Sequence, residues 1–307
     1  MAKIVFMGTP AFAVPSLRAL IDGHEVVAVV TQPDRSAGRQ RELRASPVKR
    51  LACSANIPVI QPRKIAEEAS IEELRSWKAD VYVVAAFGQI LPQALLDLPR
   101  HGAVNVHASL LPRWRGAAPI QAAIRAGDPQ SGITIMLIDA GLDSGPLLSK
   151  RALALAQDET GQSLHDRLAL LGAELLVETL PGYIRGDIKA QPQDDRQATY
   201  APRIKKEDGN IDWACSAASI ERLVRAFKPW PGTFTRWKGA QLKIAAGYMG
   251  GGSAGMGQVV EQDDGIAIGT GEGLYFPTEL QLPGKRPLPV SDFVNGYSDF
   301  IGSTLGC

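Results

Sequence analysis

The first half of the chain alternates short apolar runs with stretches of helical length, and this alternation most restricts the folds available to it. Runs rich in Val, Ile and Ala occur at residues 3–7, 25–31, 81–86, 103–106 and 133–138. Two of the intervening stretches open with a natural N-cap residue before proline, Thr9-Pro10 and Ser46-Pro47. Buried strands alternating with helices are typical of an α/β domain with a mostly parallel sheet.

The sequence changes in character after Gly209. A long helix is predicted at about residues 160–185, and a connector follows it. Beyond the connector, short strand-like segments separated by glycine-rich turns indicate a small β-barrel. We therefore predict a first domain at residues 1–188, a linker at 189–208 and a second domain at 209–307, with Ser291 as the N-cap of a short terminal helix.

The composition bounds the class of protein. A chain of 307 residues with 45% hydrophobic and 21% charged residues can bury a sizeable core in each of two domains. The apolar run at residues 4–7 is shorter than the roughly 7 residues of a secretory signal core, and no stretch approaches the roughly 20 needed to cross a bilayer. The three cysteines show no CxxC spacing. We expect a cytoplasmic protein without a metal or an obligatory protein partner.

A glycine-rich segment invites a misleading interpretation. Residues 250–255 match the dinucleotide fingerprint GxGxxG, but a strand-like run follows them where a helix would have to receive the pyrophosphate. The first turn after the first strand, at Gly8, lacks the three-glycine pattern. We therefore do not expect a nucleotide-dependent oxidoreductase.

Polar side chains occur at the end of one buried strand. Asn105 and His107 are two residues apart at the end of the apolar run 103–106, so their side chains should leave the same face of the strand. Asp143 follows the apolar run 133–138. We expect the two runs to be parallel strands of a βαβ crossover whose carboxyl ends meet at one sheet edge. An amide donor, an imidazole and a carboxylate suit acyl transfer to an amine.

Each of the three residues also has a structural interpretation. An asparagine at a strand end can satisfy a turn, a single histidine is more often structural than catalytic, and an aspartate between glycines often caps a turn. Their joint occurrence at converging positions favours function.

Basic residues are concentrated in two segments although the formal net charge is only +1. The first lies within residues 35–50 and contains Arg35, Arg39, Arg41, Arg44, Lys49 and Arg50. The second lies within residues 221–243 and contains Arg222, Arg225, Lys228, Arg236, Lys238 and Lys243. Such segments are either solvated surfaces or a basic face for a nucleic acid.

Motifs along most of the chain carry a family resemblance. They are Met7-Gly-Thr-Pro-Ala-Phe-Ala13, Thr31-Gln-Pro-Asp-Arg35 with Ala37-Gly-Arg39, Ser46-Pro-Val-Lys49, Ala86-Phe-Gly-Gln-Ile-Leu-Pro92, the block at residues 105–119 and Ala226-Phe-Lys-Pro-Trp-Pro231. With Asp143 they resemble the folate-dependent formyltransferase family. The arginine-bearing loop and the Pro-Trp-Pro segment are similar to those of its tRNA-specific members. Phe87, where tyrosine is common, and a loop less rich in lysine after Arg39 depart from the pattern.

The resemblance implies a Rossmann-like formyltransferase domain followed by an OB-like β-barrel domain. It implies catalytic roles for Asn105, His107 and Asp143. It further implies that Ser109, Leu110, Leu111 and Pro112 form part of the folate site. The loop at residues 34–44 becomes the expected tRNA-binding element through Arg35, Arg39, Arg41 and Arg44, with Arg39 as first choice for discriminating the tRNA.

The implied reaction transfers the formyl group of 10-formyltetrahydrofolate to the α-amino group of methionine carried by initiator tRNA. Asn105 would donate a hydrogen bond to the oxygen that gains negative charge, His107 would move protons, and Asp143 would orient the imidazole. Other users of the same donor remain open, namely a formyltetrahydrofolate hydrolase or an enzyme that formylates an amino sugar. An RNA-binding protein without catalysis also remains open.

Overall fold

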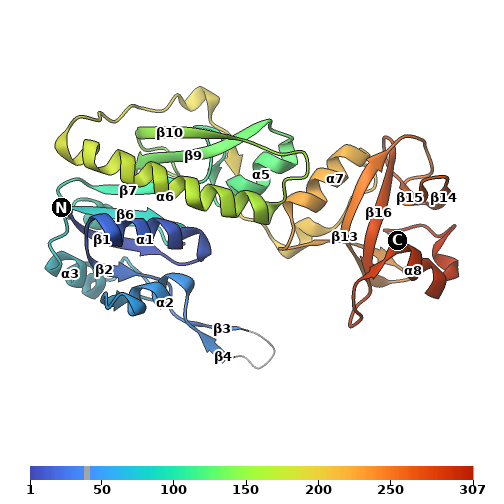
Figure 1. The fold of residues 1–307 in the computed structure, drawn as a ribbon, viewed down its shortest axis with the longest axis horizontal. Helices are drawn as coiled ribbons and strands as arrows, with labels where there is room; N and C mark the ends of the chain where they lie inside the picture. Colours follow the sequence, from blue (N-terminus) through green and yellow to red (C-terminus); the bar gives the residue numbers. More distant parts are fainter. Residues whose placement is uncertain (38–41, 307) are drawn as a thin grey trace. The chain divides into compact units, whose positions relative to one another are not determined.

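The computed structural model describes residues 1–37 and 42–306, which divide into two compact units. The first consists of Met1–Pro119, Gln130–Ala154 and His165–Ala201. The second consists of Ile120–Pro129, Leu155–Leu164 and the chain from Pro202 onward. In Figure 1 the first unit is drawn mostly in blue to yellow colours, and the larger part of the second unit, from Pro202 onward, in orange to red.

A 7-stranded sheet forms the centre of the first unit, in the order β10-β9-β7-β6-β1-β2-β5. Neighbouring strands from β7 to β5 are parallel, which confirms a mostly parallel sheet. The strand β9 is antiparallel to both β7 and β10, so the expected parallel crossover between the two apolar runs is wrong. The strands are β1 (Lys3–Gly8), β2 (Glu25–Val30), β5 (Val59–Ile60), β6 (Val81–Ala85), β7 (Ala103–His107), β9 (Gln130–Leu137) and β10 (Leu147–Ala154).

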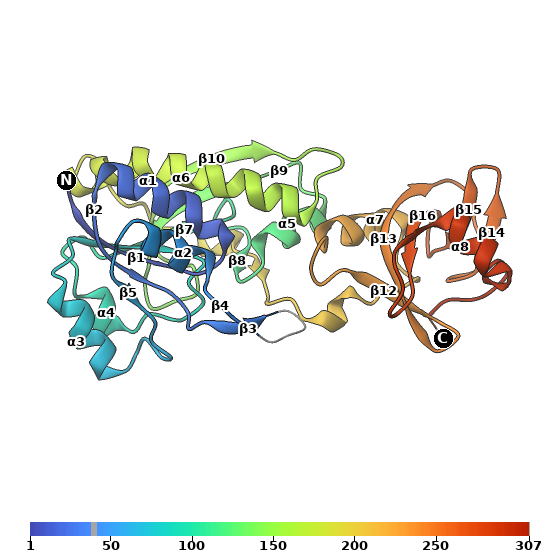
Figure 2. The ribbon, with the colours of Figure 1, turned by 60° about the horizontal axis from the view of Figure 1, so that its bottom comes forward.

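Helices cover both faces of this sheet. Figures 1 and 2 place α1 and α6 on one face and α3 and α4 on the other. The long helix predicted from the sequence is α6. The helices of this unit are α1 (Val14–Gly23), α2 (Pro47–Ser54), α3 (Glu68–Ser76), α4 (Gln93–Leu96) and α6 (Gly161–Arg185), with 3-10 turns at Ala11–Ala13 and Asp195–Gln197. The helix α5 (Pro119–Ala126) belongs almost wholly to the second unit.

The two predicted helix openings have different outcomes. Ser46 is the N-cap of α2, because its Oγ accepts a hydrogen bond from the Lys49 amide at 3.0 Å. Thr9 is not an N-cap. Its hydroxyl donates to the Phe87 carbonyl at 3.1 Å and so ties the end of β1 to the loop after β6, while a 3-10 turn separates it from α1.

Alternation along the strands builds the core. Val5 and Met7 of β1 and Tyr82 and Val84 of β6 point to one face, where they join a cluster with residues of α3 and α4. Burial raises the pKa of the Tyr82 hydroxyl to about 12. The same cluster includes Ala103, the first residue of β7.

An antiparallel sheet forms the second unit, in the order β12-β13-β16-β15-β14, with β17 added to β16. The pairings among the described strands leave β12 and β14 at opposite ends, so they do not close a barrel. Ser291 lies inside α8 and is not its N-cap, because the helix begins at Val290. The elements are α7 (Ala217–Ala226), β12 (Thr233–Trp237), β13 (Ala240–Gly250), β14 (Val259–Gln262), β15 (Gly265–Gly269), β16 (Leu274–Gln281), β17 (Leu288–Pro289) and α8 (Val290–Gly296), with 3-10 turns at Lys206–Gly209 and Ser298–Phe300.

Aromatic residues fill the core of this unit. Trp237 meets the rings of Phe293, Tyr297 and Phe300 at centroid distances of 5.8, 5.7 and 5.4 Å. These near edge-to-face contacts join α8 and the turn after it to β12. The residues 250–255 lead from β13 toward β14 rather than into a helix, as expected for a chance match to the dinucleotide motif.

Candidate active site

His107 ends strand β7 and is almost fully buried, with 6% of the residue exposed. Its Nε2 lies 3.0 Å from the carbonyl oxygen of Trp114. A carbonyl oxygen can only accept a hydrogen bond, so Nε2 must carry the proton of the neutral ring. The unprotonated nitrogen is then Nδ1. This atom faces the carboxylate of Asp143, with 3.7 Å between Nδ1 and Oδ2.

Asp143 reaches the imidazole from a loop, residues 138–146, and not from the end of a neighbouring parallel strand. Since β9 is antiparallel to β7, its last residue, Leu137, lies opposite Val104 near the start of β7. The loop must therefore return toward His107. Asp143 has a φ of 50°, a left-handed conformation that aspartate tolerates better than most residues.

A backbone amide fixes the carboxylate. The amide of Gly116 donates to Asp143 Oδ2 at 2.8 Å, which aims that oxygen at the space beside His107. Gly116 has a φ of 114°, and a Cβ atom there would lie 2.7 Å from the Ala201 carbonyl oxygen. It belongs to the short strand β8 (Arg115–Gly116), which pairs in parallel with β11 (Tyr200–Ala201). Only glycine suits this position.

Asn105 lies two residues before His107 in an uninterrupted strand, so the two side chains share a face. Ala103 lies on the same face of β7 and belongs to the core cluster that includes residues of α3 and α4. Asn105 is half-buried, and within residues 1–37 and 42–306 no side chain or backbone group hydrogen-bonds to its carboxamide. The structure thus brings His107 and Asp143 together and places Asn105 beside them on β7.

The segment after His107 is tightly held. The hydroxyl of Ser109 donates to the Arg113 carbonyl at 2.6 Å, and the amide of Leu111 donates to Thr134 Oγ1 at 3.1 Å. Ser109 and Leu111 are fully buried, whereas Leu110 and Pro112 are half-buried. The segment therefore shapes the turn between His107 and Trp114, and only its two half-buried members have surface to offer a ligand.

The predicted arginine loop forms part of a β-hairpin. Arg35 belongs to β3 (Arg35–Ala37), which pairs in antiparallel fashion with β4 (Glu42–Arg44). Arg44 is exposed. Arg39 and Arg41 lie outside the described residues.

A polar network anchors the first strand of this hairpin. Lys49 Nζ lies 2.6 Å from Asp34 Oδ2, and Gln61 Nε2 donates to Asp34 Oδ1 at 2.8 Å. The Lys49 hydrogen bond, assisted by that from Gln61, lowers the pKa of the Asp34 carboxyl. The hairpin therefore leaves the sheet from a fixed position.

The second basic segment is partly engaged inside its own unit. Arg225 pairs with Glu221 and donates to the Glu159 carbonyl, and Lys238 pairs with Asp299. Lys228, Arg236 and Lys243 are exposed. The exposed members are the ones that can meet a polyanion.

Two further properties of the described chain bear on function. Its residues gather no group of three or more His, Cys, Asp or Glu side chains suited to a metal ion. None of its helices is long and apolar enough to span a membrane.

Three groups that contact His107 or Asp143 were not predicted from the sequence. The Trp114 carbonyl, the Gly116 amide and Gln193 all act through contacts that depend on the folded chain. Trp114 and Gly116 lie in the central motif at residues 105–119, whereas no motif includes Gln193.

Sequence and structural comparisons agree with this architecture. The profile described as "Formyl transferase" matches residues 2–180, and that described as "Formyl transferase, C-terminal domain" matches residues 203–298. The chain belongs to the formyl transferase family. It is 48% identical to a methionyl-tRNA formyltransferase of Geobacter sulfurreducens, over 99% of this chain and 96% of the relative. It is 50% identical to one of Pseudomonas paraeruginosa, over 99% of each.

Two solved structures share the fold at low sequence identity. One is an N-formyltransferase from Helicobacter canadensis in complex with folinic acid and dTDP-3-aminofucose, with a TM-score of 0.68 and 19% identity over 90% of this chain and 98% of that one. The other is HypX from Aquifex aeolicus in complex with tetrahydrofolic acid, with a TM-score of 0.64 and 19% identity over 98% of this chain and 48% of that one.

The position of Gly116 gives a direct test of the site's frame. We expect Gly116→Ala to lower the free energy of unfolding by about 2–4 kcal/mol, because it combines backbone strain with a steric clash. Gly186→Ala is the matched control, since Gly186 has a φ of 86° but open space around its Cβ position. It should cost only about 1–2 kcal/mol. Urea unfolding measures both; equal losses would contradict the proposed close approach to Ala201.

Proposed function

We propose that this chain transfers the formyl group of 10-formyltetrahydrofolate to the α-amino group of methionine on initiator tRNA, which gives formylmethionyl-tRNA for translation initiation. The observation that carries the proposal is 48–50% identity, over nearly the whole of both chains, to relatives named methionyl-tRNA formyltransferase. The imidazole and carboxylate beside a half-buried carboxamide support it. We also propose that the activity is cytoplasmic, because its product is used in translation initiation.

The bound folate donor supplies the formyl group, and the chain's own residues manage charge and protons around it. Asn105 donates a hydrogen bond to the oxygen on which negative charge grows, and loss of one such donor typically costs about 2.7–4 kcal/mol. His107 exchanges protons at Nδ1, because the Trp114 carbonyl engages Nε2. Asp143 stabilises the imidazolium that results from proton uptake.

We propose that apolar side chains bind the folate donor beside Asn105, His107 and Asp143. Its flat ring system needs apolar contacts beside the reacting group. Ile90, in the loop after β6, and Leu142, next to Asp143, are large apolar side chains with 89% and 61% exposure. We assign donor binding to these two and to the segment Ser109, Leu110, Leu111 and Pro112. Leu110 and Pro112 make the contact, while Ser109 and Leu111 hold the segment in shape.

Recognition of tRNA is assigned to the arginines of the hairpin and to the second unit. Arginine offers planar donors that match phosphates and base edges, so Arg35, Arg39, Arg41 and Arg44 are the proposed tRNA contacts. We also propose that the second unit is an OB-like nucleic-acid-binding domain at residues 209–307, after a formyltransferase domain at 1–188 and a linker at 189–208. Its exposed Lys228, Arg236 and Lys243 support this role.

Acceptor competition tests the function. Offered methionyl initiator tRNA together with a nucleotide-linked amino sugar, the enzyme should formylate only the tRNA, as measured by incorporation of labelled formyl groups. His107→Ala and Asp143→Asn should each lower the rate about 10²–10⁴-fold, the usual contribution of a positioned acid–base group. His165→Ala and Asp166→Asn alter another His–Asp contact, at 2.8 Å on α6, and should leave the rate unchanged. Exclusive use of the sugar would refute the proposal.

Arg44 tests the assignment of the hairpin. We expect Arg44→Ala to raise KM for the tRNA and to reduce the slope of log affinity against log salt by about 1, while KM for the folate donor stays constant. Arg100→Ala is the control. Arg100 is exposed but precedes β7, near the strand end opposite to His107. Equal rises in both KM values for Arg44→Ala would argue against a tRNA contact.

A further inference from the structure

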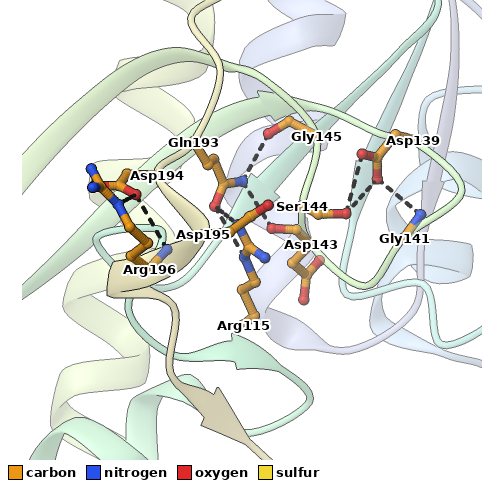
Figure 3. A network of polar contacts seen from close by, with 10 residues as sticks. All are labelled: Arg115, Asp139, Gly141, Asp143, Ser144, Gly145, Gln193, Asp194, Asp195 and Arg196. Atoms are coloured by element: carbon orange, nitrogen blue, oxygen red, sulfur yellow. Dashed lines mark hydrogen bonds and ion pairs between the residues drawn. The ribbon is translucent and has the colours of Figure 1, made fainter.

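The side chain of Gln193 lies between the loop that carries Asp143 and the guanidinium group of Arg115. Its Nε2 donates to the carbonyl oxygens of Asp143 at 2.9 Å and of Gly145 at 2.8 Å. Its Oε1 accepts from Arg115 Nε at 3.1 Å and Nη2 at 2.9 Å. Figure 3 shows this amide bridging the Asp143 loop and the Arg115 guanidinium.

The orientation of this amide follows from its partners. Arginine can only donate and a backbone carbonyl can only accept. A flipped amide would therefore place its NH₂ group against the donors of Arg115 and its oxygen against the two carbonyl oxygens. Both protons of Nε2 and both acceptor sites of Oε1 are used. The bridge is therefore fully satisfied in one orientation alone, and it holds the backbone at Asp143 and at Gly145, two residues later.

Arg115 anchors the other end of the bridge. Only 4% of its side chain is exposed, and its Nη2 lies 2.7 Å from Asp195 Oδ1. Burial acts to lower the pKa of this guanidinium, but hydrogen bonds with Asp195 and Tyr200 outweigh it and raise the pKa above its ordinary value. Arg115 thus stays charged at every pH of interest, and the acceptor side of Gln193 always has its partner.

The segment around Gln193 holds both loops of the site. Gln191 exchanges backbone hydrogen bonds with Leu147, directly after the Asp143 loop. Thr199 accepts the Trp114 amide on its hydroxyl at 2.9 Å and the Arg115 amide on its carbonyl at 2.9 Å. Residues 191–201 thereby hold two loops. One carries Asp143, and the other carries the Trp114 carbonyl that accepts the hydrogen bond from His107.

We propose that Gln193 is a positioning residue for the reaction, holding the Asp143 carboxylate beside His107 through the backbone of residues 143–145. The proposal rests on the proposed function for its kinetic consequence. The residues 189–201 of the predicted linker then do more than join two domains, because they brace the site itself. A displacement of about 1 Å at a reacting group can cost about 100-fold in rate.

The variant Gln193→Glu separates positioning from simple packing. A glutamate keeps the acceptor toward Arg115 and adds charge to it, but it turns a carboxylate oxygen toward two carbonyl oxygens. We expect Gln193→Glu and Gln193→Ala to lower kcat about 10- to 100-fold and to change KM for either substrate less than about 2-fold. Gln191→Ala is the matched control, since Gln191 pairs with Leu147 through its backbone alone.

Two readouts decide the outcome. Wild-type kcat in Gln193→Glu would show that Gln193 merely partners Arg115 and would overturn the proposal. A fall in kcat that simply follows a loss of melting temperature would overturn it too. Amide hydrogen exchange of residues 138–146 provides the second readout, and it should accelerate in both Gln193 variants but not in Gln191→Ala. This readout needs no substrate. If the wild type fails to formylate methionyl-tRNA, the proposed function fails while the exchange data still test the bridge.

Discussion

The hydrogen bond between His107 Nε2 and the Trp114 carbonyl is the contact on which the rest of the site depends. It assigns the ring proton to Nε2 and leaves Nδ1 as the nitrogen that can take up a proton. Asp143 lies on that side. The ring is almost fully buried, with 6% of the residue exposed. In the proposed reaction, the ring nitrogen that exchanges a proton is therefore set by the backbone of the loop after β7.

Much of the surrounding structure maintains this one arrangement. Trp114 has a φ of 63°, which is unusual for a bulky residue, and its amide is held by Thr199. Gly116, two residues later, directs the Asp143 carboxylate. These strained or restricted positions occur next to His107 and Asp143. Such strain persists only where neighbouring contacts over-determine the backbone, and it is concentrated at functional sites in general.

Local sequence patterns predicted the features that depend on interactions between residues close in the sequence. The apolar runs gave the strands of a mostly parallel sheet, the spacing of Asn105 and His107 gave their shared face, and the Ser46 side chain caps its helix as expected. Strand direction was not predictable in the same way. The antiparallel course of β9 is set by how the whole sheet packs, as is the failure of β12 to pair with β14.

Long-range contacts account for what the sequence did not reveal. Threonine is a common N-cap residue, but the hydroxyl of Thr9 donates instead to the carbonyl of Phe87, which is distant in the sequence. Gln193 is separated by 50 residues from Asp143 and by 78 from Arg115, and nothing in its local sequence marks it as part of the site. Residues that position catalytic groups through the backbone leave no spacing pattern of their own. They become visible only when donors and acceptors are matched in three dimensions.

The most direct test of the central claim is the ¹⁵N NMR spectrum of the His107 ring in the free enzyme, at a pH where the ring is neutral and with His107→Gln to assign the signals. We expect Nε2 to carry the proton and Nδ1 to resonate as an unprotonated nitrogen. A ring protonated at Nδ1, with Nε2 bare against the Trp114 carbonyl, would contradict it.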